Sequence, residues 1–142
     1  LGYNVRPTDI TGFLGHTQLP YLNDIINRRF ANFKRLNKAC LENEDFVGLK
    51  ILNMNVISNF AYPVVCKDKQ TFEKYKLIFQ SNNIEIRPII GGSMVEQPFF
   101  KKYIKLKYDC TNAHFVHQNG FYIPNRPDLT LEEMDLMVRL LG

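Results

Sequence analysis

The feature that most constrains the fold is a long helical repeat of apolar residues near the start of the chain. Pro20 fits the first turn of this helix, because its missing N–H would be unpaired there in any case. A shorter helix is predicted before it, capped by Thr8 and ending near His16. In the long helix the apolar side chains recur at steps of three and four residues, on one face: Leu22, Ile25, Ile26, Phe30, Phe33, Leu36 and Cys40.

The middle of the chain predicts two short strands with a helix between them. Residues Phe60–Cys66 form the first strand, and Pro63 directs that strand to the edge of a sheet, because proline cannot donate to a neighbour. Asp68 caps a helix that covers Lys69–Gln80. Residues Ile84–Arg87 then alternate apolar and polar side chains, as a half-buried strand does.

The last third repeats this alternation of helix and strand. Short helices are predicted over Gln97–Tyr103 and Thr111–Gln118, and a strand over Phe121–Ile123 after a turn at Asn119–Gly120. Thr130–Glu133 reads TLEE, a capping box that starts a final helix. The apolar face predicted for that helix consists of Leu131, Met134, Val138 and Leu141.

Short strands that alternate with helices after an opening helical arm predict an α+β fold. We expect a short, mainly antiparallel sheet covered by helices. A length of 142 residues corresponds to one domain or to a piece of a larger protein. Because the first residue is Leu1 rather than Met, we expect that processing or truncation has removed a preceding segment.

Composition limits the classes of partner. The net charge of +4 is a mild excess that does not by itself imply nucleic acid. The longest uncharged stretches, Ile51–Cys66 and Cys110–Asn125, are too short and too polar to span a bilayer. We expect no membrane partner and find no secretory signal. The three widely spaced cysteines, Cys40, Cys66 and Cys110, favour free thiols in a reducing compartment, and therefore a cytoplasmic protein.

Three local patterns suggest chemistry, but each has an ordinary structural explanation. His114 and His117 lie one helical turn apart, with Cys110 before them, yet no convincing third ligand follows, so we expect no metal. Gly91–Ser93 forms a turn rich in N–H donors that lacks the pattern of a nucleotide-binding P-loop. The segment Lys101–Tyr108 mixes lysine with tyrosine, which is typical of an RNA-binding face and also of a lysine-protected edge strand. We favour the edge strand and expect no nucleic-acid partner.

Several segments, in order along the chain, resemble one family. Residues Gly2–Ile10 read GYNVRPTDI, which resembles the GYN-x-R motif of the DegT/DnrJ/EryC1/StrS family of pyridoxal-phosphate (PLP)-dependent sugar aminotransferases. Asn83–Pro88 is similar to a strand of that family, and Gln97–Phe100 to its QP-aromatic segment. Asn119–Met134 resembles its closing strand, turn and last helix. The resemblance covers essentially the whole chain.

The resemblance implies the C-terminal part of a fold-type I PLP transferase. Residues 1–45 would form an N-terminal helical arm that ends the large domain, and residues 46–142 the small C-terminal α/β domain. In the family, the lysine that binds PLP as a Schiff base lies upstream of the GYN motif. No lysine of this sequence matches that position, so we expect no catalytic residue and no activity from this chain alone, although the implied cofactor of the parent protein is PLP.

The resemblance also implies candidate binding residues. In the family, the motif's asparagine and arginine reach the cofactor phosphate and substrate of the neighbouring subunit, which by match assigns this role to Asn4 and Arg6. An amide and a guanidinium suit phosphate oxygens. Alternatively, Asn4 holds a turn and Arg6 pairs with Asp9. Arg87 and Ser93 are candidates for contact with the sugar nucleotide.

The function that the resemblance implies is transfer of an amino group from glutamate to a 4-keto-6-deoxy sugar nucleotide, for cell-surface polysaccharide, by a homodimeric parent protein. Residues Ile86–Met94 are more similar to members that make lipopolysaccharide sugars, which include a PLP-dependent 3-dehydrase. Two alternatives therefore stay open. The parent is this dehydrase relative, or the chain is a non-catalytic dimerisation or interaction module.

Overall fold

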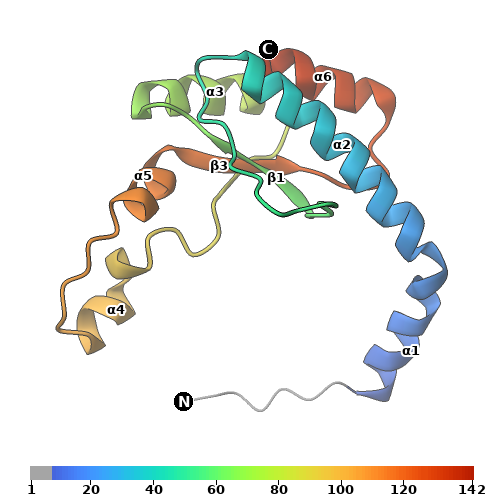
Figure 1. The fold of residues 1–142 in the computed structure, drawn as a ribbon, viewed down its shortest axis with the longest axis horizontal. Helices are drawn as coiled ribbons and strands as arrows, with labels where there is room; N and C mark the ends of the chain where they lie inside the picture. The colour runs from blue at the N-terminus through green and yellow to red at the C-terminus, as the bar shows by residue number, and fades with distance from the viewer. Residues whose placement is uncertain (1–7) are drawn as a thin grey trace.

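The computed structural model describes residues 8–142. Two helices open the described part of the chain, and further helices separate its strands (Figure 1). The α-helices are α1 (Asp9–Gln18), α2 (Leu22–Glu42), α3 (Lys69–Ser81), α4 (Pro98–Tyr103), α5 (Thr111–Asn119) and α6 (Leu131–Leu141). The strands are β1 (Ala61–Val65), β2 (Arg87–Pro88) and β3 (Gly120–Pro124), and two 3-10 turns are η1 (Leu19–Tyr21) and η2 (Met94–Glu96).

The three strands form one antiparallel sheet in the order β1-β3-β2. Opposed residues of antiparallel strands share a face, and successive residues alternate between the two faces. Tyr62 and Val64 of β1 lie opposite Ile123 and Phe121 of β3, and all four are buried. Tyr122 therefore lies on the other face, where it is only half-buried.

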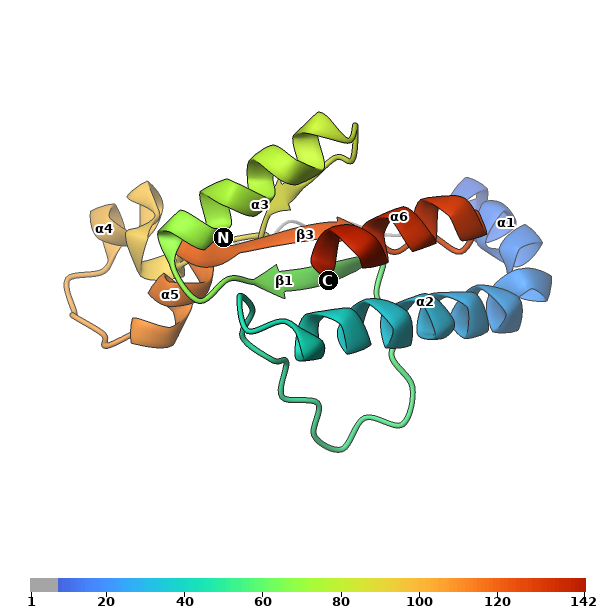
Figure 2. The same cartoon turned by 90° about the horizontal axis from the view of Figure 1, so that it is seen from above.

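Helices cover one face of this sheet. In Figures 1 and 2, α2, α3 and α6 lie together on one side of β1 and β3, while α1 and α4 extend away at opposite ends. The helix side chains that fill the core come from all three covering helices: Phe33, Leu36, Ala39, Cys40, Tyr75, Phe79, Met134, Met137 and Leu141. The expected α+β fold with a small antiparallel sheet covered by helices is confirmed.

Side-chain hydrogen bonds begin three of the helices where the sequence predicts it. The Thr8 hydroxyl accepts from the Thr11 N–H at the start of α1. The Asp68 carboxylate accepts from the Thr71 N–H at 2.7 Å and starts α3. Thr130 forms the complete predicted capping box at α6. These caps satisfy N–H groups that have no partner inside the helix.

Several predicted boundaries are wrong for physical reasons. Pro20 lies in η1 rather than in α2, which begins two residues later. Only Arg87 of the predicted strand 84–87 pairs with β3, because β2 is two residues long. The predicted turn at Asn119–Gly120 is absent, since α5 ends at Asn119 and β3 starts at the next residue.

Two further interpretations are also wrong. Leu131 is 76% exposed because it starts α6, and Met137 takes its place in the core. The lysine-rich segment 101–108 is not an edge strand: it comprises the end of α4 and a stretch without helix or strand. By contrast, β1 with Pro63 does lie at the sheet edge, as predicted.

The described cysteines are free thiols, two of them buried as expected. Burial raises the pKa of the Cys40 thiol to about 11, so the thiol stays protonated at neutral pH. Within residues 8–142, no helix combines the length and apolarity needed to cross a membrane. The division into an arm (1–45) and a domain (46–142) stays a prediction.

Asp45 connects the loop after α2 to the next strand and helix. Its two carboxylate oxygens accept from Lys67 Nζ at 2.6 Å and Lys74 Nζ at 2.8 Å. The Tyr75 hydroxyl donates to the same carboxylate at 3.2 Å. Hydrogen bonds from the two lysines, Lys67 first, lower the pKa of Asp45 to about 2. This cluster fixes the loop that returns the chain from α2 to the sheet.

Substitution of Leu36 tests the packing of the hydrophobic core. The Leu36 side chain is fully buried between α2 and the sheet, and Leu36→Ala is expected to lower the free energy of unfolding by about 2–5 kcal/mol, through lost burial and a cavity. Leu77→Ala on α3, where leucine is 65% exposed, is the matched control. Urea denaturation followed by circular dichroism measures both, and equal losses would contradict this packing.

Substitution of Asp45 tests how the stability of the protein depends on pH. The pKa of Asp45 in the folded state lies below the ordinary value of 3.8, so its contribution to stability is present above about pH 4 and is lost as the pH falls towards 2. Asp45→Asn is therefore expected to destabilise the protein at pH 7 and to matter progressively less below pH 4. Urea midpoints across this range measure the difference, with Asp24→Asn as an exposed control. A difference independent of pH would refute the lysine contacts.

Candidate functional site

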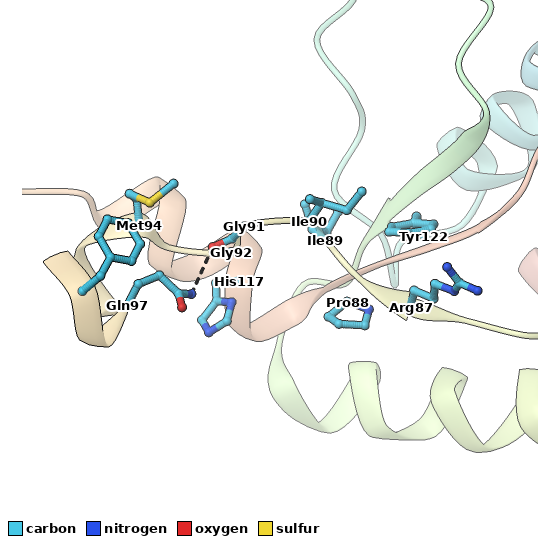
Figure 3. A pocket seen from close by; sticks show the side chains of 11 residues that line it. Arg87, Pro88, Ile89, Ile90, Gly91, Gly92, Met94, Gln97, His117 and Tyr122 are labelled. Carbon is cyan, nitrogen blue, oxygen red and sulfur yellow. Dashed lines mark hydrogen bonds between the residues drawn. The ribbon is translucent and has the colours of Figure 1, made fainter. Parts of the chain in front are cut away.

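An open cavity of about 530 Å³ lies at the β2 end of the uncovered sheet face. The cavity lies between the chain that leaves β2 and the helix α5 (Figure 3). Its walls combine apolar side chains, backbone of a glycine turn and a few polar groups. The lining residues are Arg87, Pro88, Ile89, Ile90, Gly91, Gly92, Met94, Gln97, Phe99, His117 and Tyr122.

Arg87 is the only Lys, Arg, Asp or Glu side chain among these lining residues. Its Nε donates to Glu85 Oε1 at 2.7 Å, and its side chain also contacts Tyr122 on the paired strand. The Glu85 carboxylate, and to a smaller degree Tyr122, raise the pKa of Arg87. The Arg87 side chain is 62% exposed, so the remaining guanidinium donors can reach a ligand. A guanidinium so placed suits an anionic or hydroxylated ligand.

A smaller depression of about 160 Å³ lies on the other side of Arg87 and Tyr122. It is lined further by Phe60, whose ring meets the Tyr122 ring edge-on at 5.7 Å. Arg126 lies at its rim. Arg87 and Tyr122 therefore separate two adjoining depressions on the face that no helix covers.

The turn after β2 needs glycine. Gly91 and Gly92 have φ angles of +79° and +53°, in the left-handed region that other residues rarely adopt. A Cβ on Gly92 would lie 2.1 Å from Nδ1 of His117, so the imidazole packs directly against the turn. Gln97 Nε2 donates to the Gly91 carbonyl at 3.1 Å and holds the turn from the α4 side (Figure 3).

Ser93, a candidate for contact with the sugar nucleotide, does not line the cavity. Its side chain is fully buried behind the glycine turn, and its Oγ has no hydrogen-bond partner among the described residues. Arg87, by contrast, lies where a ligand in the cavity would meet it. The roles of both residues stay predictions. Asn4 and Arg6 lie outside the described residues.

Sequence reasoning did not select three residues that line the cavity. In the sequence, His117 stands out only as half of a pair with His114, and Gln97 only as part of a segment that resembles the family. Tyr122 had a usable signal, because the apolar neighbours on either side of it in β3 place it on the opposite face. The signal for His117 is tertiary, since its neighbour Gly92 is distant in sequence.

The cavity can bind and orient a ligand, but its described lining offers no amine for a Schiff base. Among residues 8–142, no lysine and no carboxylate lines it, so no amine is available as a nucleophile and no acidic residue pairs with one. In that part of the chain, no group of three His, Cys, Asp or Glu side chains is placed to hold a metal.

Residues 1–141 match the DegT/DnrJ/EryC1/StrS aminotransferase family. This chain belongs to that family. It is 27% identical to the lipopolysaccharide biosynthesis protein RfbH of Salmonella typhimurium, across 97% of this chain and 32% of that protein. It is 26% identical to GDP-4-keto-6-deoxy-D-mannose 3-dehydratase of Escherichia coli O55:H7, across 99% of this chain and 37% of that enzyme.

Solved structures show the same fold. The E. coli GDP-4-keto-6-deoxy-D-mannose-3-dehydratase with bound hydrated PLP superimposes with a TM-score of 0.80 at 23% identity, over 99% of this chain and 37% of that one. Helicobacter pylori PseC, an aminotransferase of pseudoaminic acid biosynthesis, gives a TM-score of 0.78 at 19% identity, over 99% and 38%. The chain thus spans about a third of the length of the relatives that it matches.

The described residues do not by themselves fit PLP. Its chemistry needs an amine to carry the cofactor and an acidic partner for its ring nitrogen, and the cavity offers neither within residues 8–142. It does offer Arg87, backbone donors and apolar walls. These groups suit an anionic or hydroxylated ligand.

Substitution of Gly92 tests whether His117 packs against the glycine turn. Gly92→Ala is expected to cost about 1–3 kcal/mol from its positive φ, with a further loss from the contact with His117. Gly91→Ala is the matched control, because its φ is also positive but the space around it is open. Adding His117→Ala to Gly92→Ala should restore the part of the unfolding free energy that is lost through the contact with His117. Urea denaturation measures all three, and identical losses for Gly91→Ala and Gly92→Ala would contradict the packing of His117.

Proposed function

We propose that this chain is the substrate-facing, C-terminal part of a PLP-dependent enzyme that acts on a nucleotide-linked 4-keto-6-deoxy sugar. The observation that carries the proposal is the position of Arg87. Its guanidinium lies at the uncovered face of the sheet, between two depressions and beside Tyr122. The named reactions of the relatives, and membership of the family, support this substrate class.

Arg87 would hold the substrate through hydrogen bonds to sugar hydroxyl or phosphate oxygens, while Glu85 fixes the orientation of the guanidinium from behind. Tyr122 and Phe60 would offer apolar surface to the sugar ring. Gln97 and His117 keep the glycine turn in place beside it. These residues bind and orient. The cofactor would supply the electron sink for the reaction, held by residues beyond those described here.

Two reactions are consistent with the family. Amino transfer from glutamate would yield an amino sugar, as the family name indicates. A specific observation favours the alternative of dehydration at carbon 3: three of the relatives in the sequence comparison are named 3-dehydratases. Product analysis separates the two, because dehydration removes a hydroxyl group from the sugar and amino transfer leaves nitrogen on it.

The surface of α1 supports assembly with further protein. Ile10, Phe13 and Leu14 on α1 are between 58% and 73% exposed, and α1 carries no lysine or arginine. Such an apolar helix face is typical of a surface that another protein element covers. We propose a homodimer in which Asn4 and Arg6, just before α1, reach the site of the neighbouring subunit. A cytoplasmic location agrees with this substrate class.

Arg87→Ala is expected to raise KM for the nucleotide sugar by about 10- to 100-fold, which corresponds to the loss of one charge-assisted hydrogen bond. Steady-state kinetics on the intact protein supplied with PLP, a GDP- or dTDP-linked 4-keto-6-deoxy sugar and glutamate measures it. Arg139→Ala is the control, because Arg139 lies on α6, in the helix layer that covers the other face of the sheet. No product from any keto-sugar nucleotide would refute the proposed function, and an unchanged KM would refute the role of Arg87 alone.

A further inference from the structure

A second surface, across α4 from the cavity, concentrates lysine and exposed apolar side chains. We define the lysine segment as residues 101–108, which read KKYIKLKY. It begins in the last turn of α4 and continues without helix or strand. In Figure 1 this part lies at the extreme edge of the molecule, at the end opposite α1 and away from the layer of α2, α3 and α6.

Within residues 8–142, the apolar side chains of the lysine segment are exposed. Tyr103 is 70% exposed, Leu106 69% and Tyr108 55%. Ile104 and Leu106 line a groove of about 550 Å³ between the segment and α4, which Phe100 and Tyr108 close with an edge-on pair of rings. Large apolar residues gathered on one exposed strip indicate a surface that meets something apolar.

Most of the lysines in the segment have no carboxylate partner. Lys101 binds Glu96 at 2.6 Å, whereas Lys102, Lys105 and Lys107 form no ion pair with any carboxylate of residues 8–142. The three cations are exposed and lie within six residues of one another. They alternate with Ile104 and Leu106, so the strip offers positive charge and apolar surface together.

This combination distinguishes the lysine segment from α1. The exposed apolar face of α1 has no lysine or arginine, and it suits an apolar protein surface. Lysine, by contrast, is depleted in the buried centre of protein interfaces, because its ammonium group is costly to dehydrate. The partner of the lysine segment must therefore supply both negative charge and an apolar layer.

We propose that the lysine segment docks the protein on the surface of an anionic lipid bilayer. Leu106, Tyr103 and Tyr108 would enter the boundary between headgroups and acyl chains, where amphipathic aromatic rings are favoured. Lys102, Lys105 and Lys107 would contact lipid phosphates. The contact is peripheral, since the described helices include none able to span the membrane. It revises the expectation of no membrane partner, which considered only spanning segments, and it does not rest on the proposed enzymatic function.

Vesicle co-sedimentation tests the docking. The intact protein is expected to bind phosphatidylcholine vesicles that contain phosphatidylglycerol, and not vesicles of phosphatidylcholine alone. Binding should weaken as salt rises from 0.1 M to 1 M, because the screening length falls from about 10 Å to about 3 Å. Binding that does not depend on lipid charge would overturn the proposal in favour of a simple apolar site. Binding that inorganic phosphate abolishes at constant ionic strength would overturn it in favour of a phosphate site.

Matched charge variants locate the contact. Lys102→Gln/Lys105→Gln/Lys107→Gln is expected to weaken vesicle binding by about 100-fold, at about fivefold for each lysine near an anionic surface. The control, Lys34→Gln/Lys38→Gln/Lys50→Gln, removes the same charge from α2 and the loop that follows it. Equal losses in the two variants would show an effect of net charge only and would overturn the assignment to this segment.

Fluorescence tests insertion independently, because the chain contains no tryptophan. The emission of Leu106→Trp is expected to shift to shorter wavelength on anionic vesicles. Leu131→Trp on α6, at a similarly exposed leucine, is expected to stay unchanged. No shift at position 106 would overturn the proposal, as would salt-sensitive binding to single-stranded RNA that exceeds binding to the vesicles.

Discussion

The rest of the structure depends on the alternation of side chains along β3. Phe121 and Ile123 point into the core, where they meet the rings and aliphatic groups of α2, α3 and α6. Because three helices pack on that face, the intervening Tyr122 must point the other way. The same rule applies through the pairing with β2, which places Arg87 opposite Tyr122. Burial of one sheet face thus determines which residues a ligand can reach.

The ends of the sheet are held by polar contacts that the core alone does not supply. Asn125, fully buried after β3, donates from Nδ2 to the Asn59 carbonyl at 2.9 Å and to the Arg29 carbonyl of α2 at 3.3 Å. This side chain therefore joins α2, the approach to β1 and the exit from β3. At the opposite side, the Asp45 cluster performs the same task for the loop after α2. A small sheet with one covered face relies on such junctions to keep its strands in register.

The uncovered side of the molecule has two chemically different surfaces. The cavity beside Arg87 is mostly apolar, with one cation and a rigid glycine turn, which suits a defined small ligand. The lysine segment is extended, exposed and rich in positive charge, which suits a broad anionic surface. Their separation across α4 lets each bind without the other, because Gln97 and Phe99 face the cavity while Phe100 and Lys101 line the groove.

The sequence by itself determined the elements that have local causes. Thr8, Asp68 and Thr130 start helices through hydrogen bonds within three residues, and Pro63 places β1 at an edge, so each could be read from its neighbours. The family motifs are likewise short contiguous segments of the sequence. Tertiary structure decided the rest: β2 is limited to Arg87 and Pro88, which pair with β3, and Leu131 lies exposed in the first turn of α6. His117 lies in the site because its imidazole packs against Gly92, which is distant in sequence, whereas Ser93 is buried outside the site. Such contacts depend on the packing of distant segments, which no local sequence pattern indicates.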